Sequence, residues 1–242
     1  RGAGRGTLTM QAKKAFFLAI IAGIVGGALS AAINLTKVQA QQGKIADFYA
    51  DELVAPGIID EGEFNQELQL LQVQNVALPI AVGIGGGVLV AAVYLRIGTS
   101  AFKVALAVAG AAWLALYVIP ALRYPANPDT VFNTGGDSGY SVLYTGYTAA
   151  SGLAALGSAI AFSRTRRKNW YIGAAGVYTG IIGVLYFLFP AFSGLEFVPQ
   201  QLLTGWRSSM AASMTALWFT LGIVAGALLE REEKKKGAGR GI

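Results

Sequence analysis

The residues of this sequence best suited to bind or admit an ion lie in a polar string after an apolar stretch. Arg123, Tyr124, Asn127 and Asp129 fall within positions 120–129, which also hold three prolines. Proline lacks a backbone donor and biases the preceding residue away from helical geometry, so the chain must leave its helix here in an extended form. The amide and carboxylate oxygens of Asn127 and Asp129 would then be available to a cation where the helix ends.

A second polar cluster, Trp206 and Arg207, stands just ahead of the last apolar stretch. The charge pattern described below places both clusters on the same face of a membrane. Two interpretations stay open. The six side chains line an entrance together, or they anchor the protein at the lipid headgroups.

Acidic side chains offer a third candidate site. Asp47, Asp51 and Glu52 share a helix face through their spacing, and together they would attract cations. They form a candidate metal cluster, and the alternative is a solvated acidic surface.

The sequence has no histidine and no cysteine. Imidazole and thiolate, which many transition-metal sites use, are therefore missing, and a metal ion would have to be bound by oxygen. Besides Asn127 and Asp129, the hydroxyl groups of the stretch 141–162 could supply that oxygen, or serve only as interhelical hydrogen bonds. There is no pairing of nucleophile and base and no cofactor motif, so we expect neither an enzyme nor a bound cofactor.

Six apolar stretches of about twenty residues must position these groups. They cover residues 15–35, 76–95, 104–122, 141–162, 170–192 and 210–229, and none contains an acidic or basic side chain. Each is long enough to cross a hydrocarbon core of about 30 Å as a helix. The predicted fold is an all-α polytopic membrane protein, a six-helix bundle, in which 15–229 form one domain. Residues 1–14 and 230–242 are expected to be disordered charged tails.

Charge predicts the orientation. Fifteen of the nineteen basic residues fall in the two tails and in the second and fourth loops, whereas ten of the thirteen acidic residues fall in the other loops. Lys and Arg beside membrane spans are retained in the cytoplasm, so both termini are expected inside and loops one, three and five outside. The net charge of +6 then reflects topology and anionic lipid, and is no argument for nucleic acid.

The first loop, 36–75, is the longest. Its helical pattern breaks near Pro56-Gly57 and resumes with acidic residues, which suit a helix N-terminus. An apolar stripe through Phe64, Leu68 and Leu71 predicts an amphipathic helix outside the membrane, packed on the bundle.

Three Gly-x-x-x-Gly pairs occur within the spans: Gly23 and Gly27, Gly83 and Gly87, and Gly222 and Gly226. Small residues let membrane helices approach closely. We expect these six glycines to serve helix packing, with a pore-lining face as the alternative.

Several of these motifs resemble the CbtA family of predicted cobalt transporter subunits. The resemblance rests on the Pro120–Pro128 string, the Ser, Ala and Gly-rich fourth stretch, the closing pattern Leu202-Leu203, Trp206-Arg207, Ser209, Leu217-Trp218 and Gly222, and the opening Ala22-Gly23 to Gly27. This sequence departs from the family pattern in the Gly-rich loop after Asp129 and in having no histidine. The resemblance implies a multi-pass inner-membrane protein associated with uptake of cobalt or another divalent cation.

The alternative function is a non-transporting accessory subunit of a larger membrane complex. Either function implies contact with lipid and with another membrane subunit or a second copy of this chain. The missing histidine and the absence of acidic residues within the spans favour the accessory subunit, because ion paths through membranes usually contain ionisable groups.

Overall fold

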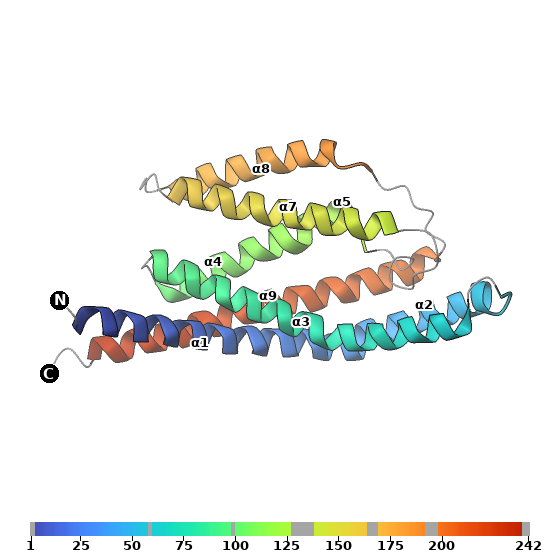
Figure 1. Ribbon diagram of the computed structural model, residues 1–242, viewed down its shortest axis with the longest axis horizontal. Coiled ribbons are helices and arrows are strands. Elements are labelled where there is room, and N and C mark those ends of the chain that lie inside the picture. Colours follow the sequence, from blue (N-terminus) through green and yellow to red (C-terminus); the bar gives the residue numbers. More distant parts are fainter. Residues whose placement is uncertain are drawn as a thin grey trace. The chain divides into compact units, whose positions relative to one another are not determined.

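The computed structural model describes residues 3–57, 60–97, 100–126, 138–163, 169–191 and 198–238, and the described part is built from helices (Figure 1). The helices are α1 (Ala3–Ile33), α2 (Gln39–Tyr49), α3 (Glu61–Ile97), α4 (Ala101–Trp113), α5 (Ile119–Arg123), α7 (Ser138–Ser163), α8 (Trp170–Leu188) and α9 (Gln200–Ala238). Three single π-helical turns interrupt them: η1 (Asn34–Val38), η2 (Ala50–Val54) and η3 (Leu114–Val118). The predicted all-α class is confirmed.

Five helical segments of the described chain are long and apolar enough to cross a membrane. They are Ala12–Val54, Glu61–Ile97, Ala101–Arg123, Trp170–Leu188 and Gln200–Lys235. The fourth predicted span is helical too, as α7, but it is not among these five. Its serine, threonine and tyrosine side chains make it the most polar of the predicted spans. The described chain thus has five apolar helices that are long enough to span a membrane.

The chain divides into two compact units. Unit 1 contains residues 1–44, 69–110 and 208–242, and unit 2 contains residues 45–68 and 111–207. Each unit brings together segments that are far apart in the sequence, so each depends on tertiary contacts between helices.

Glycines set the contact between α1 and α3 in unit 1. A Cβ atom placed on Gly23 would lie 2.0 Å from the carbonyl oxygen of Gly83, and one placed on Gly87 would lie 2.2 Å from that of Ala19. Gly27 meets Pro79 in the same way. The order of these contacts makes α1 and α3 antiparallel, and their backbones touch along this crossing. Close approach through small residues is the usual way in which membrane helices associate.

Helix α9 completes unit 1 by packing on α1, α3 and α4. Gly26 of α1 lies against Leu217 and Leu221, and Gly222 and Gly226 lie against α4 near Ala109 and Phe102. All six glycines predicted to serve packing therefore lie at helix contacts within this unit.

Prolines determine the local geometry of the third predicted span. Pro120 has no N–H to donate, and the Ile119 N–H bonds to the carbonyl oxygen of Leu114, which closes the π turn η3. The helix passes through Pro120 and ends at Arg123. Tyr124, which precedes Pro125, leaves the helix with φ −128° and ψ 82°.

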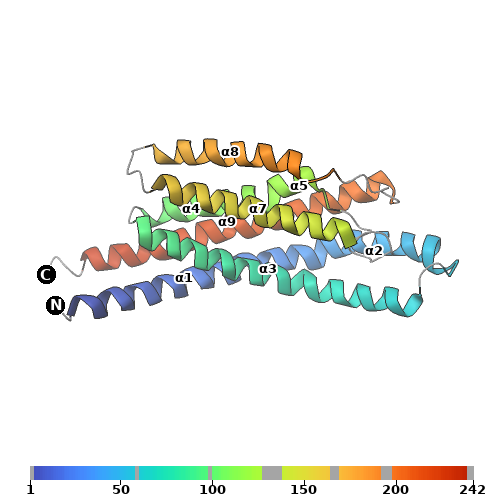
Figure 2. The same ribbon diagram turned by 45° about the horizontal axis from the view of Figure 1, so that its top comes forward.

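Helices α7 and α8 lie side by side in unit 2, as both views show (Figure 2). Gly173 meets Phe162 at one end of the pair, and Gly146 meets Phe189 at the other. The two helices are therefore antiparallel. Only Ala174 of α8 is buried.

The first predicted loop is helical nearly throughout. Helices α1 and α2 run into one another through η1, the chain turns at Gly57 with φ +77°, and α3 continues without interruption from Glu61 to Ile97. Asp60 caps α3, because its side chain accepts the Glu63 N–H at 3.0 Å. The predicted stripe is present, with Phe64 and Leu71 buried. It belongs to the start of α3 rather than to a separate helix.

The charged tails also extend the helices. Helix α1 begins at Ala3 and α9 continues to Ala238. Once a helix has formed, each further residue adds a hydrogen bond at little cost, and the pair Glu230 and Lys234 at 3.1 Å supports the last turns of α9.

Candidate functional site

Arg123 and Tyr124 of the proline-rich string are held in unit 2 by the end of α8. The Arg123 guanidinium donates from Nη2 to the carbonyl oxygen of Phe189 at 2.7 Å, and the Tyr124 hydroxyl donates to that of Pro190 at 2.7 Å. The guanidinium carbon also lies 4.2 Å from the centre of the Tyr186 ring. Both side chains therefore satisfy carbonyls that the end of a helix leaves without an intrahelical donor.

An aromatic cluster surrounds this contact. Tyr124, Tyr140 and Tyr147 are buried together, with ring centres 5.8 Å apart for Tyr124 and Tyr140 and 5.6 Å apart for Tyr124 and Tyr147. Phe189 packs edge-on against Tyr147 at 5.3 Å. The Tyr140 hydroxyl donates to the carbonyl oxygen of Pro125. Three tyrosines and a phenylalanine thus fix the exit of the chain from α5 against α7 and α8.

The second predicted cluster lies on α9 and reaches the same string. Arg207 donates from Nε to the carbonyl oxygen of Ala126 at 2.8 Å. Trp206 is buried, and its indole N–H has no hydrogen-bond partner among the described residues. The structure therefore joins the two predicted polar clusters, and the joining contact is to the backbone carbonyl of Ala126. Asn127 and Asp129 lie outside the described residues.

The predicted acidic cluster is at the surface. Asp47 lies on α2, and Asp51 and Glu52 lie in η2, with all three side chains exposed. Among the described residues no three side chains of His, Cys, Asp or Glu lie close enough together to hold a metal ion.

A line of buried neutral side chains runs through unit 1 at the end away from the chain termini. Ser30 of α1 and Ser213 of α9 are fully buried, and their hydroxyl oxygens are 2.7 Å apart. One turn further along the same face, Asn34 donates from Nδ2 to the backbone carbonyl oxygen of Asn75 at 3.0 Å. Asn75 in turn donates from its own Nδ2 to Oε1 of Gln42 at 2.7 Å. Every member of this line is 8% exposed or less.

The Asn34 contact follows from Pro79. In an α-helix the carbonyl of residue 75 accepts the N–H of residue 79, and a proline at that position has none to give. The side chain of Asn34 supplies the missing donor from another helix. Ser151 plays the same part in unit 2, where its hydroxyl donates to the carbonyl oxygen of Ala115 at 2.6 Å beside the Pro120 turn.

Sequence reasoning did not single out the line of Ser30, Asn34, Gln42, Asn75 and Ser213. The signal that could have found it is a proline within an apolar span. Such a proline frees the carbonyl four residues earlier, and a polar side chain on another span must bind it if the carbonyl is buried.

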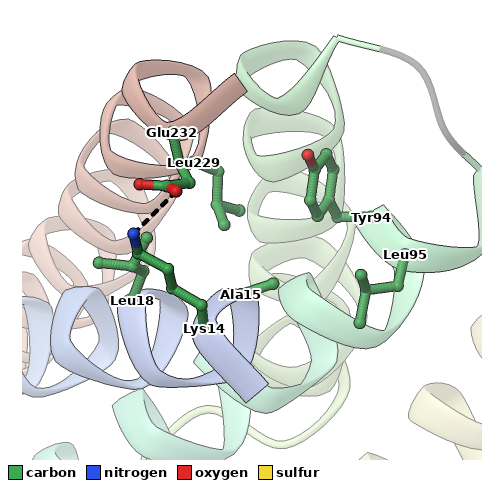
Figure 3. A pocket seen from close by; sticks show the side chains of 7 residues that line it. All are labelled: Lys14, Ala15, Leu18, Tyr94, Leu95, Leu229 and Glu232. Atoms are coloured by element: carbon green, nitrogen blue, oxygen red, sulfur yellow. Dashed lines mark ion pairs between the residues drawn. The ribbon is translucent and has the colours of Figure 1, made fainter. Parts of the chain in front are cut away.

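The opposite end of unit 1 is closed by charged contacts. Lys14 of α1 and Glu232 of α9 form an ion pair of 2.7 Å, and the Tyr94 hydroxyl of α3 donates to Glu233 at 2.8 Å. Figure 3 shows Lys14 pointing to Glu232 across a pocket that is otherwise mostly apolar. The pocket is lined by Lys14, Ala15, Leu18, Tyr94, Leu95, Leu229 and Glu232. These contacts tie the beginning of α1 to the ends of α3 and α9.

Together these features define a helical membrane protein in which the buried polar residues of the described chain are serine, asparagine and glutamine. The chain belongs to the CbtA family, because residues 12–230 match the family model described as "Probable cobalt transporter subunit (CbtA)". The resemblance predicted from the sequence is thereby confirmed. No curated protein and no solved structure matches the chain.

Proposed function

We propose that this chain is the membrane-embedded subunit of a system that transports cobalt or another divalent cation across the plasma membrane. The observation that carries the proposal is the family match, which covers nearly the whole described chain. The five apolar helices of spanning length agree with it. The cation is the cargo in this proposal, and the chain would offer it oxygen ligands and at most the thioethers of its three methionines, since the sequence has no histidine or cysteine.

In this proposal α7 is a sixth membrane span. Its 26 residues exceed the length that a hydrocarbon core of about 30 Å requires. Its hydroxyls need partners inside a membrane, and Ser151 has two, the carbonyl oxygen of Ala115 at 2.6 Å and the Tyr178 hydroxyl at 2.9 Å. Interhelical hydrogen bonds of this kind make a moderately polar helix compatible with lipid.

An even number of spans places both termini on one side. The ion pair between Lys14 and Glu232 holds the first and last helices together at that end of unit 1. Lys13, Arg96, Lys103 and Arg231 occur at the same ends of their helices. By the preference of Lys and Arg for the cytoplasmic side, we assign this end to the cytoplasm and the turn at Gly57 to the outside.

The test is cobalt accumulation in the native host. A strain lacking the chain should take up less radioactive cobalt than the parent strain, and the wild-type chain should restore uptake. Gly85→Ala serves as a matched control for expression of a substituted chain, because a Cβ at Gly85 meets nothing within 4 Å. Uptake that is unchanged by deletion would refute the proposal.

A second candidate is an accessory subunit that binds another membrane protein without transporting an ion. The exposure of α8 favours it, because only 6% of the apolar part of this helix is buried, compared with 33–44% for the other four spanning segments. The α8 glycines Gly176, Gly180 and Gly183 have open space where a Cβ would stand. The accessory function predicts a metal-free chain that is purified in gentle detergent together with a larger complex, and cobalt uptake that does not depend on it.

A further inference from the structure

We infer that Asn34 marks a cation-binding site built from neutral oxygen atoms in unit 1, at the end opposite the Lys14–Glu232 pair. The inference rests on the proposed transport function, because its ligand is the divalent cation that the protein would carry. None of the residues involved belongs to the polar clusters predicted from the sequence.

The amide of Asn34 has a fixed orientation. Its Nδ2 lies 3.0 Å from the carbonyl oxygen of Asn75, and a carbonyl can only accept a hydrogen bond. The nitrogen must therefore face Asn75, and Oδ1 must face the other way. Asn34 is only 4% exposed, and Oδ1 has no hydrogen-bond partner among the described residues. Burying an acceptor without a partner costs free energy. A bound ligand that accepts a lone pair, such as a cation, would remove this cost.

Two further oxygens lie about one turn away, the Ser30 hydroxyl on α1 and the Ser213 hydroxyl that meets it from α9. Ser30 precedes Asn34 by one turn, and residues four apart on a helix are neighbours. The hydroxyl oxygens of Ser30 and Ser213 are 2.7 Å apart, and Ser213 also lies 3.2 Å from the backbone carbonyl oxygen of Ser30. Each hydroxyl has one hydrogen and two lone pairs, so this pair can satisfy its own donors and still present lone pairs. The side chains assembled here therefore offer a cation acceptor atoms.

The local backbone supports a binding role. The π turn η1 begins at Asn34, and single π turns within helices occur frequently at functional sites. An anion would require donors, and the Asn34 donor already binds Asn75. Neutral oxygens bind a cation without the full attraction of carboxylates, and weak binding is what a transit site needs if its ion is to leave again.

The site is closed toward the other end of unit 1. Beyond Ser30 the backbones of α1 and α3 touch, and Cβ atoms on Gly23 and Gly27 would fall within 2.7 Å of backbone atoms of α3. No hydrated cation fits between α1 and α3 along this crossing. The site therefore receives its ion from the Gln42 and Asn75 end of the polar line.

The experiment measures Co²⁺ binding to the purified full chain in lipid nanodiscs by equilibrium dialysis. Asn34→Asp places a negative charge at the proposed ligand and should raise the affinity for Co²⁺ about tenfold, because ligand charge tunes affinity in oxygen sites. Asn34→Leu should remove one bound Co²⁺ per chain. Asn65→Asp adds the same charge at an exposed position of α3 and should leave binding unchanged.

A thermal melt keeps the test decisive if a variant is unstable. Asn34→Asp loses the donor to Asn75 and should melt at a lower temperature than the wild type, and millimolar Co²⁺ should recover that loss because it binds the folded state. If Asn34→Leu does not fold, Ser30→Ala takes its place and should weaken binding severalfold. Equal Co²⁺ binding by the wild type, by Asn34→Asp and by Asn34→Leu (or Ser30→Ala in its place) would overturn the inference.

Cobalt uptake separates this inference from the proposed function. If deletion of the chain leaves uptake unchanged, the proposed function fails, and the Asn34 site loses its ligand with it. If the wild-type chain restores uptake and Asn34→Leu or Ser30→Ala restores it equally well, the transport function stands and the Asn34 site is refuted.

Discussion

The hydroxyl of Ser151 donates to the backbone carbonyl oxygen of Ala115 at 2.6 Å, and this contact replaces a backbone hydrogen bond that the neighbouring helix lacks. The Ile119 N–H bonds to Leu114, and the next residue, Pro120, has no N–H, so the Ala115 carbonyl lacks an intrahelical donor. Asn34 does the same for the carbonyl that Pro79 frees at Asn75. In both units a proline within a span is matched by a buried polar side chain from another helix.

Ser151→Ala should therefore destabilise the protein. The substitution leaves a buried carbonyl without a partner and removes the bond to the Tyr178 hydroxyl, at a cost of about 1–3 kcal/mol. In a Pro120→Ala background the residue at 120 regains an N–H, and the loss should be smaller. The four proteins of this double-mutant cycle can be compared by thermal melting in detergent. Equal losses in both backgrounds would show that Ser151 does not act through the proline.

The glycine crossing of unit 1 should tolerate no side chain. Gly83→Leu places a side chain where a Cβ would lie 2.1 Å from the Gly23 carbonyl oxygen, so α1 and α3 would have to separate. We expect a large loss of monodisperse protein in fluorescence-detected size-exclusion chromatography. Gly85→Ala, two residues away, meets nothing within 4 Å and should gain up to about 1 kcal/mol from helix propensity. An equal yield of monodisperse protein from Gly83→Leu and Gly85→Ala would contradict the close backbone contact between α1 and α3.

The Tyr124 hydroxyl should contribute a modest amount to stability. Tyr124→Phe keeps the ring within its aromatic cluster and removes only the hydrogen bond to the Pro190 carbonyl, so the expected cost is about 1 kcal/mol. Tyr171→Phe on the exposed side of α8 is the matched control and should change the melting temperature little. If Tyr124→Phe also melts like the wild type, the contact with the end of α8 does not stabilise unit 2.

The sequence predicts the helices well because each apolar stretch is long, uncharged and bounded by charge or proline. It also predicts where the chain leaves the third of these helices, since the residue before Pro125 is forced out of helical geometry. The continuity of α1 with α2 and of α3 across the first loop is not predicted. Polar residues such as Gln39 and Gln69 are compatible with both loop and helix, and tertiary packing decides between them.

The site is less predictable than the fold. The sequence marks Arg123 and Arg207 as polar residues beside apolar stretches, but their partners are backbone carbonyls that no side-chain pattern reveals. The Asn34 and Asn75 contact joins positions 41 residues apart, and only the packing of α1 on α3 brings them together. A single polar residue that donates to a carbonyl freed by a proline is harder to recognise in a sequence than a repeated pattern of apolar positions.

The membrane topology can be measured directly, because the chain has no cysteine and any introduced thiol is the sole target of a maleimide. Asn65→Cys in the first loop should be labelled in intact cells by a reagent that does not cross the membrane. Lys235→Cys near the end of α9 should be labelled only after permeabilisation. Both positions are exposed, so access to solvent is not the limiting factor.

The position that tests the sixth span is Asn169, which is exposed between α7 and α8. The helix before the proline-rich string ends outside in the proposed topology, so if α7 crosses the membrane Asn169 must lie in the cytoplasm. Asn169→Cys should then behave like Lys235→Cys and be labelled only after permeabilisation. Labelling in intact cells equal to that of Asn65→Cys would mean that α7 does not cross and that the hydroxyl bonds of Ser151 hold it against its neighbours without spanning the membrane.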